Sequence, residues 1–264
     1  MIPPLSDTLM ASFAMLFRTM LLLAFACLMT GCASTNKNPQ DPFEGYNRAM
    51  FDFNDKVDAA VMKPVATAYV RVTPEFVQTG VGNFFGNIYD VPTALNNFLQ
   101  ARVANGASDV CRVLVNSTIG IAGVFDVATP IGLPKHDQDF GQTLGRWGVP
   151  SGPYVVLPLV GPTTTRDALA MTVDFETDPW GYVYPVRLRN TGIALRLIDR
   201  RAYMLGTSTL IEDAAFDRYE FVRDSYLQKR ENKIYKGEPQ ESHDPPPEDK
   251  PKSPDEPKSQ DEPH

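Results

Sequence analysis

The sequence has 264 residues, of which 43% are hydrophobic, and its 25 lysine and arginine residues stand against 32 aspartate and glutamate residues, a formal net charge of −7. This length and composition suffice for one substantial folded domain. The acidic balance argues against a nucleic-acid-binding protein, because contacts to phosphate need a basic surface.

The first predicted element is an export signal over residues 1–31. Its apolar core, residues 20–29, has no charge and is shorter than the about 20 apolar residues that a membrane-spanning helix needs. A basic residue precedes this core, and small residues ending in Gly31 follow it, so cleavage is expected after Gly31. The first nine residues carry two prolines and an acid that no signal needs, so we expect translation to begin at Met10 or Met15.

Cys32 directly follows the predicted cleavage site. A cysteine in this position resembles the lipobox of bacterial lipoproteins, in which the thiol receives a diacylglyceryl group and becomes the new N-terminus. The alternative is an ordinary secretory signal with an incidental cysteine. Ala33, and not an aspartate, comes next, which predicts sorting to the outer membrane. Residues 32–40 then form a lipidated polar tether.

The remaining cysteines predict no disulfide. Cys27 leaves with the signal and Cys32 carries the lipid, so Cys111 is the one thiol left in the mature chain. Cys111 lies in an apolar helical pattern, which predicts a small buried hydrophobic side chain.

Residues 41–235 are predicted to form one domain that is mainly α-helical. Apolar residues recur at helical spacing over 47–61, and Pro64 is expected to stop or kink that helix. Further helices are expected to begin at Thr73-Pro74-Glu75, at 90–93, at Ser108 after a break at Asn105-Gly106, at 163–167, at Thr191 and at Ser208. Strand signals are limited to 154–160 and 182–186, each interrupted by proline.

Two apolar segments are broken by glycine and proline, residues 119–134 and 148–162. They are too broken to span a membrane and too apolar for water, so they either join the core or touch lipid. We expect helical hairpins or packed loops here. The candidate contacts with membrane or lipid path in the first segment are Ile119, Ile121, Val124, Phe125, Ile131 and Leu133.

Arg146 and Trp147 form an exposed-looking turn between two glycines. The arginine could meet a phosphate and the tryptophan a headgroup region. An ordinary loop with one buried ring fits the pattern equally well.

Other motifs point to no catalysis, metal or cofactor. The stretch from His136 to Asp139 has one histidine, too few ligands for the common metal sites, and is predicted to be a polar surface turn. The glycines at 80, 82 and 86 do not match the dinucleotide fingerprint and indicate close helix contacts or a bend. No serine lies in a nucleophile elbow.

The C-terminal residues 236–264 are predicted to be a disordered acidic tail. From Gly237 to His264 there are nine acidic residues, three lysines and eight prolines, with no large apolar residue. Such a composition cannot bury enough surface to offset the ordering entropy.

Taken together, several blocks of the domain resemble the VacJ/MlaA family of outer-membrane lipoproteins. The blocks occur in family order and are residues 41–48, 82–87, Pro92, 96–100, 112–120, 139–145 and 152–162. The resemblance covers nearly all of residues 41–226.

The resemblance implies a single ring-like helical domain, with helical hairpins and few or no strands, at the periplasmic face of the outer membrane. Family members remove misplaced phospholipids from the outer leaflet, pass them to a periplasmic carrier protein, and associate with a trimeric porin. Two alternatives stay open from the residues: a periplasm-facing phospholipid hydrolase and a purely structural lipoprotein.

Overall fold

The computed structural model describes residues 38–206 and 216–235. The predicted export signal, Gly31, Cys32, most of the tether and the acidic tail lie outside these residues. So does the start of the last predicted helix, at Ser208.

The described chain is mainly helical, as predicted, with one small antiparallel sheet. In chain order the elements are α2 (Glu44–Val57), the π-helix η1 (Asp58–Met62), α3 (Lys63–Val72), α4 (Glu75–Leu99), α5 (Val103–Thr118), α6 (Phe140–Arg146), β1 (Tyr154–Leu157), β2 (Gly161–Thr164), α7 (Thr165–Thr177), the 3-10 helix η2 (Pro179–Tyr182), α8 (Val186–Tyr203) and α10 (Arg218–Tyr235). None of the helices in this part of the chain combines the length and apolar character needed to cross a membrane.

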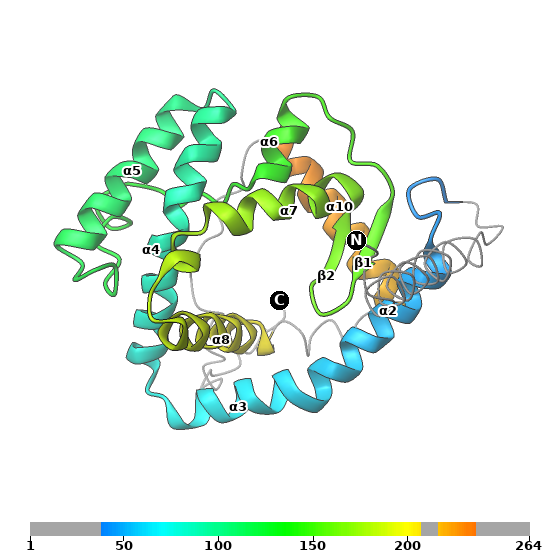
Figure 1. Cartoon of the computed structure of the whole chain (residues 1–264), viewed down its shortest axis with the longest axis horizontal. Helices are drawn as coiled ribbons and strands as arrows, with labels where there is room; N and C mark the ends of the chain where they lie inside the picture. The colour runs from blue at the N-terminus through cyan, green and yellow to red at the C-terminus, as the bar shows by residue number, and fades with distance from the viewer. Residues whose placement is uncertain (1–37, 207–215, 236–264) are drawn as a thin grey trace, which may run out of the picture.

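Contacts between these elements form a closed circuit. Starting from α2, neighbours touch in the order β1, β2, α10, α6, α4, α8 and α3, and α3 returns to α2 through η1. Figure 1 shows the ribbons following this circuit as a ring, with the α4–α5 hairpin at one side. The ring-like helical fold that the resemblance implied is confirmed.

The first arm of the ring runs from α2 to α3 without a break. Pro64 does not stop the helix; it stands in the first turn of α3, where its missing N–H costs little. The turn before it widens into η1, in which the Lys63 N–H bonds to the Asp58 carbonyl, five residues back. Of the predicted stop or kink, the stop does not occur: a π-helical bulge directly precedes Pro64, and the helix continues.

The boundaries between α4 and α5 differ from the prediction. No new helix begins near 90, because α4 continues through Pro92. α5 begins at Val103 and includes Asn105 and Gly106, which were expected to break it. Gly106 is needed there because a Cβ would lie 2.8 Å from the Phe98 ring. The close packing of the two helices thus overrides the local breaking signals.

Cys111 is exposed on α5, so the prediction of a buried thiol is wrong. Val110 and Leu114 are exposed as well, at 41% and 58%. The apolar pattern of α5 faces outward, and the polar side chains Arg112 and Asn116 face the interior.

The small sheet is held against α2 by two asparagine side chains. β1 and β2 pair antiparallel, with Tyr154 opposite Thr164. Asn47 donates to the Tyr154 carbonyl at 3.0 Å and accepts from the Val156 N–H at 2.8 Å. Asn54, two helical turns further, does the same with Leu157 and Leu159. β1 falls in the predicted stretch 154–160, whereas 182–186 holds the end of η2 and the start of α8.

Hydrophobic core residues are few and gather where the sheet meets α10. Tyr154, Val156 and Tyr219 are buried there. The Tyr219 ring packs edge-on against Phe51, with centroids 5.8 Å apart. This seam joins the first and last parts of the ring.

Candidate functional site

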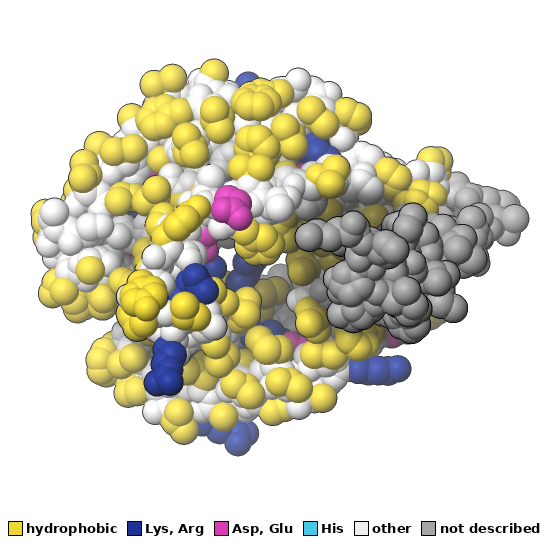
Figure 2. Space-filling view, in the orientation of Figure 1, with side chains coloured by type: hydrophobic (Ala, Val, Ile, Leu, Met, Phe, Trp, Pro, Cys, Tyr) yellow, Lys and Arg dark blue, Asp and Glu magenta, His cyan; other side chains and the backbone are white. Residues whose placement is uncertain are grey.

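The distribution of polar and apolar side chains is the reverse of that in most soluble domains. Among the described residues, buried polar and charged side chains outnumber buried hydrophobic ones. Large hydrophobic side chains are exposed instead, among them Val72 (79%), Phe76 (78%), Leu169 (76%) and Tyr184 (86%). Figure 2 shows hydrophobic side chains spread over the outer surface, and a central hollow with charged side chains at its edge. Exposed apolar surface on this scale indicates contact with lipid or with another molecule.

Charges from several elements act on one phenol in the interior. Burial raises the pKa of Tyr89, on α4, well above its usual value, and the negative charges of Asp137, Asp139 and Asp174 raise it further. Arg200 on α8 acts in the opposite direction. Charged side chains of α7, of α8 and of the segment that leads into α6 therefore act on this part of α4.

Arg230 of α10 connects two carboxylates near this interior. Its guanidinium pairs with both oxygens of Asp139, at 2.5 and 2.7 Å, and its Nε lies 2.8 Å from Asp167. Asp174, on α7, accepts the Phe140 N–H at 2.8 Å but is not neutralised in this way. Burial raises the pKa of Asp174 to about 6.

Arg112 fastens the loop after α5 to the α4–α5 hairpin. It is 1% exposed, and its Nε lies 3.3 Å from Asp90 on α4. From the loop side, Asp126 lies 3.2 Å from Nη2, while Thr129 and the Leu133 carbonyl accept from Nη1 at 2.9 and 2.6 Å. One buried cation on α5 thus binds groups from two other segments, α4 and the loop, as a buried charge requires.

The same loop satisfies much of its backbone through Asn116. The Asn116 side-chain oxygen accepts from the N–H groups of Val127 and Ala128 at 2.8 and 2.9 Å. Asn83 of α4 donates to the Val124 carbonyl at 3.2 Å. The expectation of a packed loop with internally bonded polar groups is confirmed for residues 119–134. It is wrong for residues 148–162, which contain β1 and the start of β2.

The six candidate lipid contacts in this loop divide by exposure. Ile119, Ile121, Phe125 and Ile131 are 58–67% exposed. Val124 and Leu133 are half-buried. Val124 packs against α4, where a Cβ on Gly80 would lie 3.0 Å from its Cγ1. The close contact expected at that glycine is confirmed, and the contact of the loop with lipid stays a prediction.

Arg146 and Trp147 lie at the other end of α4. The Trp147 indole, 54% exposed, donates to the Leu99 carbonyl at 2.9 Å, and its ring packs edge-on against Phe140. Gly80 and Leu99 are separated by about 28 Å along the helix, at 1.5 Å per residue. The turn and the loop therefore do not form one site, and the role of the turn stays a prediction.

The stretch around His136 is not the predicted surface turn. His136 Nδ1 lies 2.7 Å from the fully buried Asp109, and Asn97 bonds the other Asp109 oxygen at 2.7 Å. Gln138 is 1% exposed, and only Asp137 is largely open to solvent. Polar partners on α4 and α5 draw this segment inward. Within the described residues no cluster of three or more ligating side chains could hold a metal ion.

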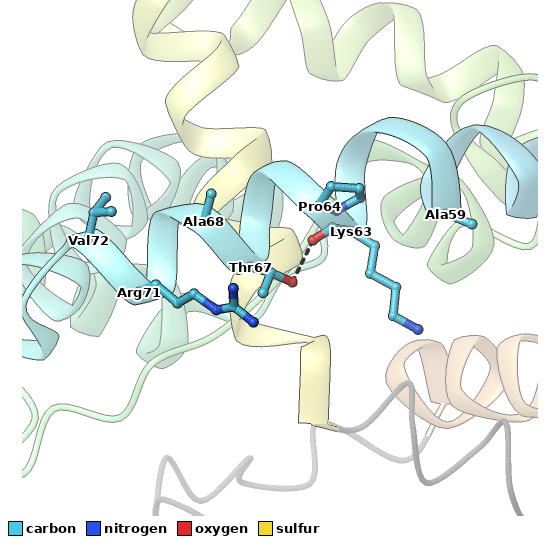
Figure 3. A pocket seen from close by; sticks show the side chains of 7 residues that line it. All are labelled: Ala59, Lys63, Pro64, Thr67, Ala68, Arg71 and Val72. Carbon is cyan, nitrogen blue, oxygen red and sulfur yellow. Dashed lines mark hydrogen bonds between the residues drawn. The ribbon is translucent and has the colours of Figure 1, made fainter.

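A groove lies along α3, on the outer wall of the ring. It has a volume of about 480 Å³ and is lined by Ala59, Lys63, Pro64, Thr67, Ala68, Arg71 and Val72. Figure 3 shows the Lys63 and Arg71 side chains leaving α3 on the same side, with Thr67 between them.

The buried polar network was missed in the sequence because the helices were assigned from apolar residues alone. Polar side chains at positions 83, 87, 90 and 97 recur at intervals of three, four and seven on α4, as 109, 112 and 116 do on α5. Such spacing marks one helical face. Each of these helices thus carries one polar face and one apolar face. The regular spacing of the polar residues was the signal that the polar face could be the buried one.

The comparisons with known proteins agree with this geometry. The family model of the MlaA lipoprotein matches residues 39–233. The chain is similar to the intermembrane phospholipid transport system lipoprotein MlaA of Escherichia coli K12, with 34% identity over 214 residues, 77% of this chain and 83% of the relative. It is also similar to the protein of the same name from Haemophilus influenzae, with 30% identity over 88% of this chain and 95% of the relative.

A solved structure described as the structural basis for maintenance of bacterial outer membrane lipid asymmetry has the same fold. The TM-score is 0.64 at 32% identity, over 72% of this chain and 96% of the solved chain. The shared part therefore includes nearly the whole of that solved chain.

Proposed function

The chain belongs to the MlaA lipoprotein family, and from this premise we propose that it removes mislocalised phospholipids from the outer leaflet of the outer membrane and passes them to a periplasmic carrier. This activity is intermembrane phospholipid transport, and it maintains the lipid asymmetry of the outer membrane. Three relatives carry the name of that transport system.

The observation that supports this proposal is the ring with an apolar wall and polar interior. A phospholipid can leave a leaflet only if its headgroup finds a polar route while its acyl chains stay in an apolar environment. The exposed hydrophobic side chains can face acyl chains, and Arg200, together with the carboxylates that act on Tyr89, can interact with a headgroup. These side chains can bind a headgroup or contact acyl chains. Transport breaks no bond in the lipid, so we propose a transporter without catalytic activity.

Two features of the chain support the position that we propose in the membrane. The exposed hydrophobic side chains of the ring suit one leaflet of the bilayer, on the periplasmic face. Diacylglyceryl and acyl chains on Cys32 would hold it there, because several acyl chains give stable attachment where one is marginal. Buried Asp41 begins the folded domain only nine positions after Cys32.

The proposed partners are a trimeric porin and the periplasmic carrier. The α4–α5 hairpin and the loop after it present Leu114, Ile119 and Phe125 outward, at 58–67% exposure. An apolar wall of this kind can pack against the lipid-facing surface of a barrel. Co-purification of a porin from solubilised outer membrane would test this association, and its absence at native expression would contradict it.

The test of the transport function is genetic and biochemical. A strain lacking the protein should accumulate phospholipid in the outer leaflet, and the full chain should restore the normal distribution. The Cys32→Ala variant should be left unlabelled by palmitate and should fail to restore it. A strain whose surface phospholipid is unchanged by the deletion would contradict the proposal, and fatty acid release by the purified protein would favour a hydrolase.

The Arg146 and Trp147 turn can be tested in the same strain. Replacement of both residues by alanine should raise surface phospholipid if the turn meets headgroups. Unchanged surface phospholipid at a normal protein level would assign the turn to an ordinary loop.

A further inference from the structure

The groove on α3 combines two cations with an apolar floor. Lys63 and Arg71 are eight residues apart, about 12 Å along the helix at 1.5 Å per residue. Ala59, Pro64, Ala68 and Val72 supply the apolar lining. Thr67 lies between the cations, and its hydroxyl donates to the Lys63 carbonyl at 2.7 Å.

Arg71 is available for a ligand. Its side chain is exposed and makes no hydrogen bond or ion pair with any described residue. By contrast, Arg48, Arg112, Arg201, Arg218 and Arg230 all pair with carboxylates. These five arginines therefore stabilise the fold through ion pairs, whereas Arg71 forms no ion pair with a described residue.

The face of α3 beside the groove is apolar and uncovered. Val61 and Val65 are 52% and 41% exposed, and Phe76, just after α3, is 78% exposed. A helix with one exposed apolar face and cations along its edge suits a membrane interface, where acyl chains meet the apolar side and long basic side chains reach the phosphates.

The groove is separate from the polar interior of the ring. α8 packs on the other side of α3, where Tyr69 donates to Asp199 at 2.9 Å and Arg201 pairs with Asp58. In Figure 3, α8 passes behind α3 as seen from the groove. A ligand in the groove would therefore lie on the outer wall.

We propose that this groove binds the headgroup phosphate of a net-anionic phospholipid from the leaflet around the ring. The Arg71 guanidinium offers paired donors that match phosphate oxygens, and Lys63 adds a second positive charge toward the headgroup. The acyl chains then lie along Val61, Val65 and Val72. The bound lipid fixes the depth of this arm in the leaflet. This inference rests on the proposed function in one respect, namely that the ring is surrounded by phospholipids.

The test measures lipid affinity of the purified full chain. Native mass spectrometry would give apparent Kd values for phosphatidylglycerol and for phosphatidylcholine with the same acyl chains. Arg71→Gln should weaken phosphatidylglycerol binding about fivefold and Arg71→Gln with Lys63→Gln about thirtyfold, since each cation near an anionic lipid contributes a factor of about five. Phosphatidylcholine binding should weaken less, because its headgroup has the same phosphate but no net charge.

The matched control is Arg187→Gln, which removes one exposed positive charge on α8, outside the groove. It should leave both Kd values unchanged. The proposal would be overturned if Arg187→Gln weakened phosphatidylglycerol binding as much as Arg71→Gln does, or if the groove variants weakened phosphatidylcholine binding equally. It would also be overturned if the double variant had wild-type thermal stability and an unchanged Kd for phosphatidylglycerol.

The two proposals fail in distinguishable ways. If the wild-type chain does not restore lipid asymmetry in the deletion strain, the transport function fails whatever the groove binds. If it does, and the double variant still binds phosphatidylglycerol as the wild type does, only the groove proposal fails. Displacement of the lipid by inorganic phosphate alone would show a site for free phosphate and would also overturn it.

Discussion

Individual charged side chains inside this protein affect its stability in different ways. Asp174 is the clearest case, because it is partly buried near the carboxylates of Asp139 and Asp167 and accepts the Phe140 N–H. Arg112 is the opposite case, since four groups surround its guanidinium. The two residues should therefore respond in opposite directions when their charge is removed.

Asp174→Asn is expected to raise the melting temperature near neutral pH and to have little effect near about pH 4. Burial raises the folded-state pKa of Asp174 to about 6. Its protonated form therefore stabilises the fold fully below the unfolded pKa of about 3.9, and this contribution is lost as the pH rises through about 6. Asparagine keeps an oxygen for the Phe140 N–H.

Thermal unfolding of both proteins in the same detergent across that pH range would check this. Asp52→Asn, at an exposed position on α2, is the control and should shift the melting temperature little at either pH. A difference between wild type and Asp174→Asn that is the same at both pH values would contradict the expectation.

Arg112→Gln should lower the free energy of unfolding by about 3–5 kcal/mol, because it removes the buried cation that Asp90 and Asp126 share and leaves Asp90 with only the more distant Lys135, at 3.8 Å. Hydrogen exchange should also rise in the loop that Arg112 fastens, at residues 126–133. Arg187→Gln should stay within about 0.5 kcal/mol of the wild type, as an exposed change normally does. Unchanged exchange in the loop would show that Arg112 does not hold it.

At the scale of elements, the sequence predicted helices well and their junctions poorly. Amphipathic periodicity located the helical segments, and the family blocks implied their arrangement as a ring. The breaking signals at Pro92 and Gly106 were misleading, because α4 continues through Pro92 and α5 includes Gly106, which packs against the Phe98 ring. The packing of α4 against α5 is a tertiary feature, and the local sequence does not record it.

Only part of the candidate site could be predicted from the sequence. The exposed apolar residues of the loop, such as Ile119 and Phe125, followed from composition. The interior could not be found in that way, since Asp139, Asp167 and Arg230 meet only when α6, α7 and α10 pack together. The groove on α3 likewise needed the structure, which shows that Lys63 and Arg71 share a side.

Gly120→Ala should destabilise the junction between α5 and its loop by about 1–3 kcal/mol, the usual cost of overpacking. A Cβ at Gly120 would lie 2.1 Å from the Phe125 carbonyl oxygen and 2.6 Å from that of Asn116. Because both are backbone atoms, neither can swing aside.

Gly45→Ala is the matched control, since nothing lies within 4 Å of a Cβ there. Alanine in that helical position should be neutral or stabilise by up to about 1 kcal/mol. Chemical unfolding of both variants would check the pair, and equal stability of the two would count against the crowding described at Gly120.

At the scale of the whole molecule, the ring depends on a seam between its first and last segments. Asp41 is fully buried there and accepts from Asn47, the Tyr219 hydroxyl and Arg223, at 2.8, 2.5 and 3.3 Å. Asp224 also pairs with Arg223 but is 66% exposed.

Asp41→Ala should cost about 3–5 kcal/mol of unfolding free energy and abolish the rescue of lipid asymmetry, because it removes the buried partner of Arg223 and opens the seam. Asp224→Ala removes the exposed partner of the same arginine and should cost about 1 kcal/mol or less. Thermal unfolding and complementation would measure both. Similar stabilities for the two variants would show that the seam does not depend on Asp41.

The placement of this seam has a consequence for biogenesis. Arg48 pairs with Asp217 at 2.9 Å, and Arg218 pairs with Asp55 at 2.9 Å. These ion pairs join α2, the first helix of the circuit, to the start of α10, the last one. A polypeptide exported amino-end first can close this circuit only when α10 has emerged. A partly exported chain therefore lacks the seam, and its first and last helices cannot yet stabilise each other.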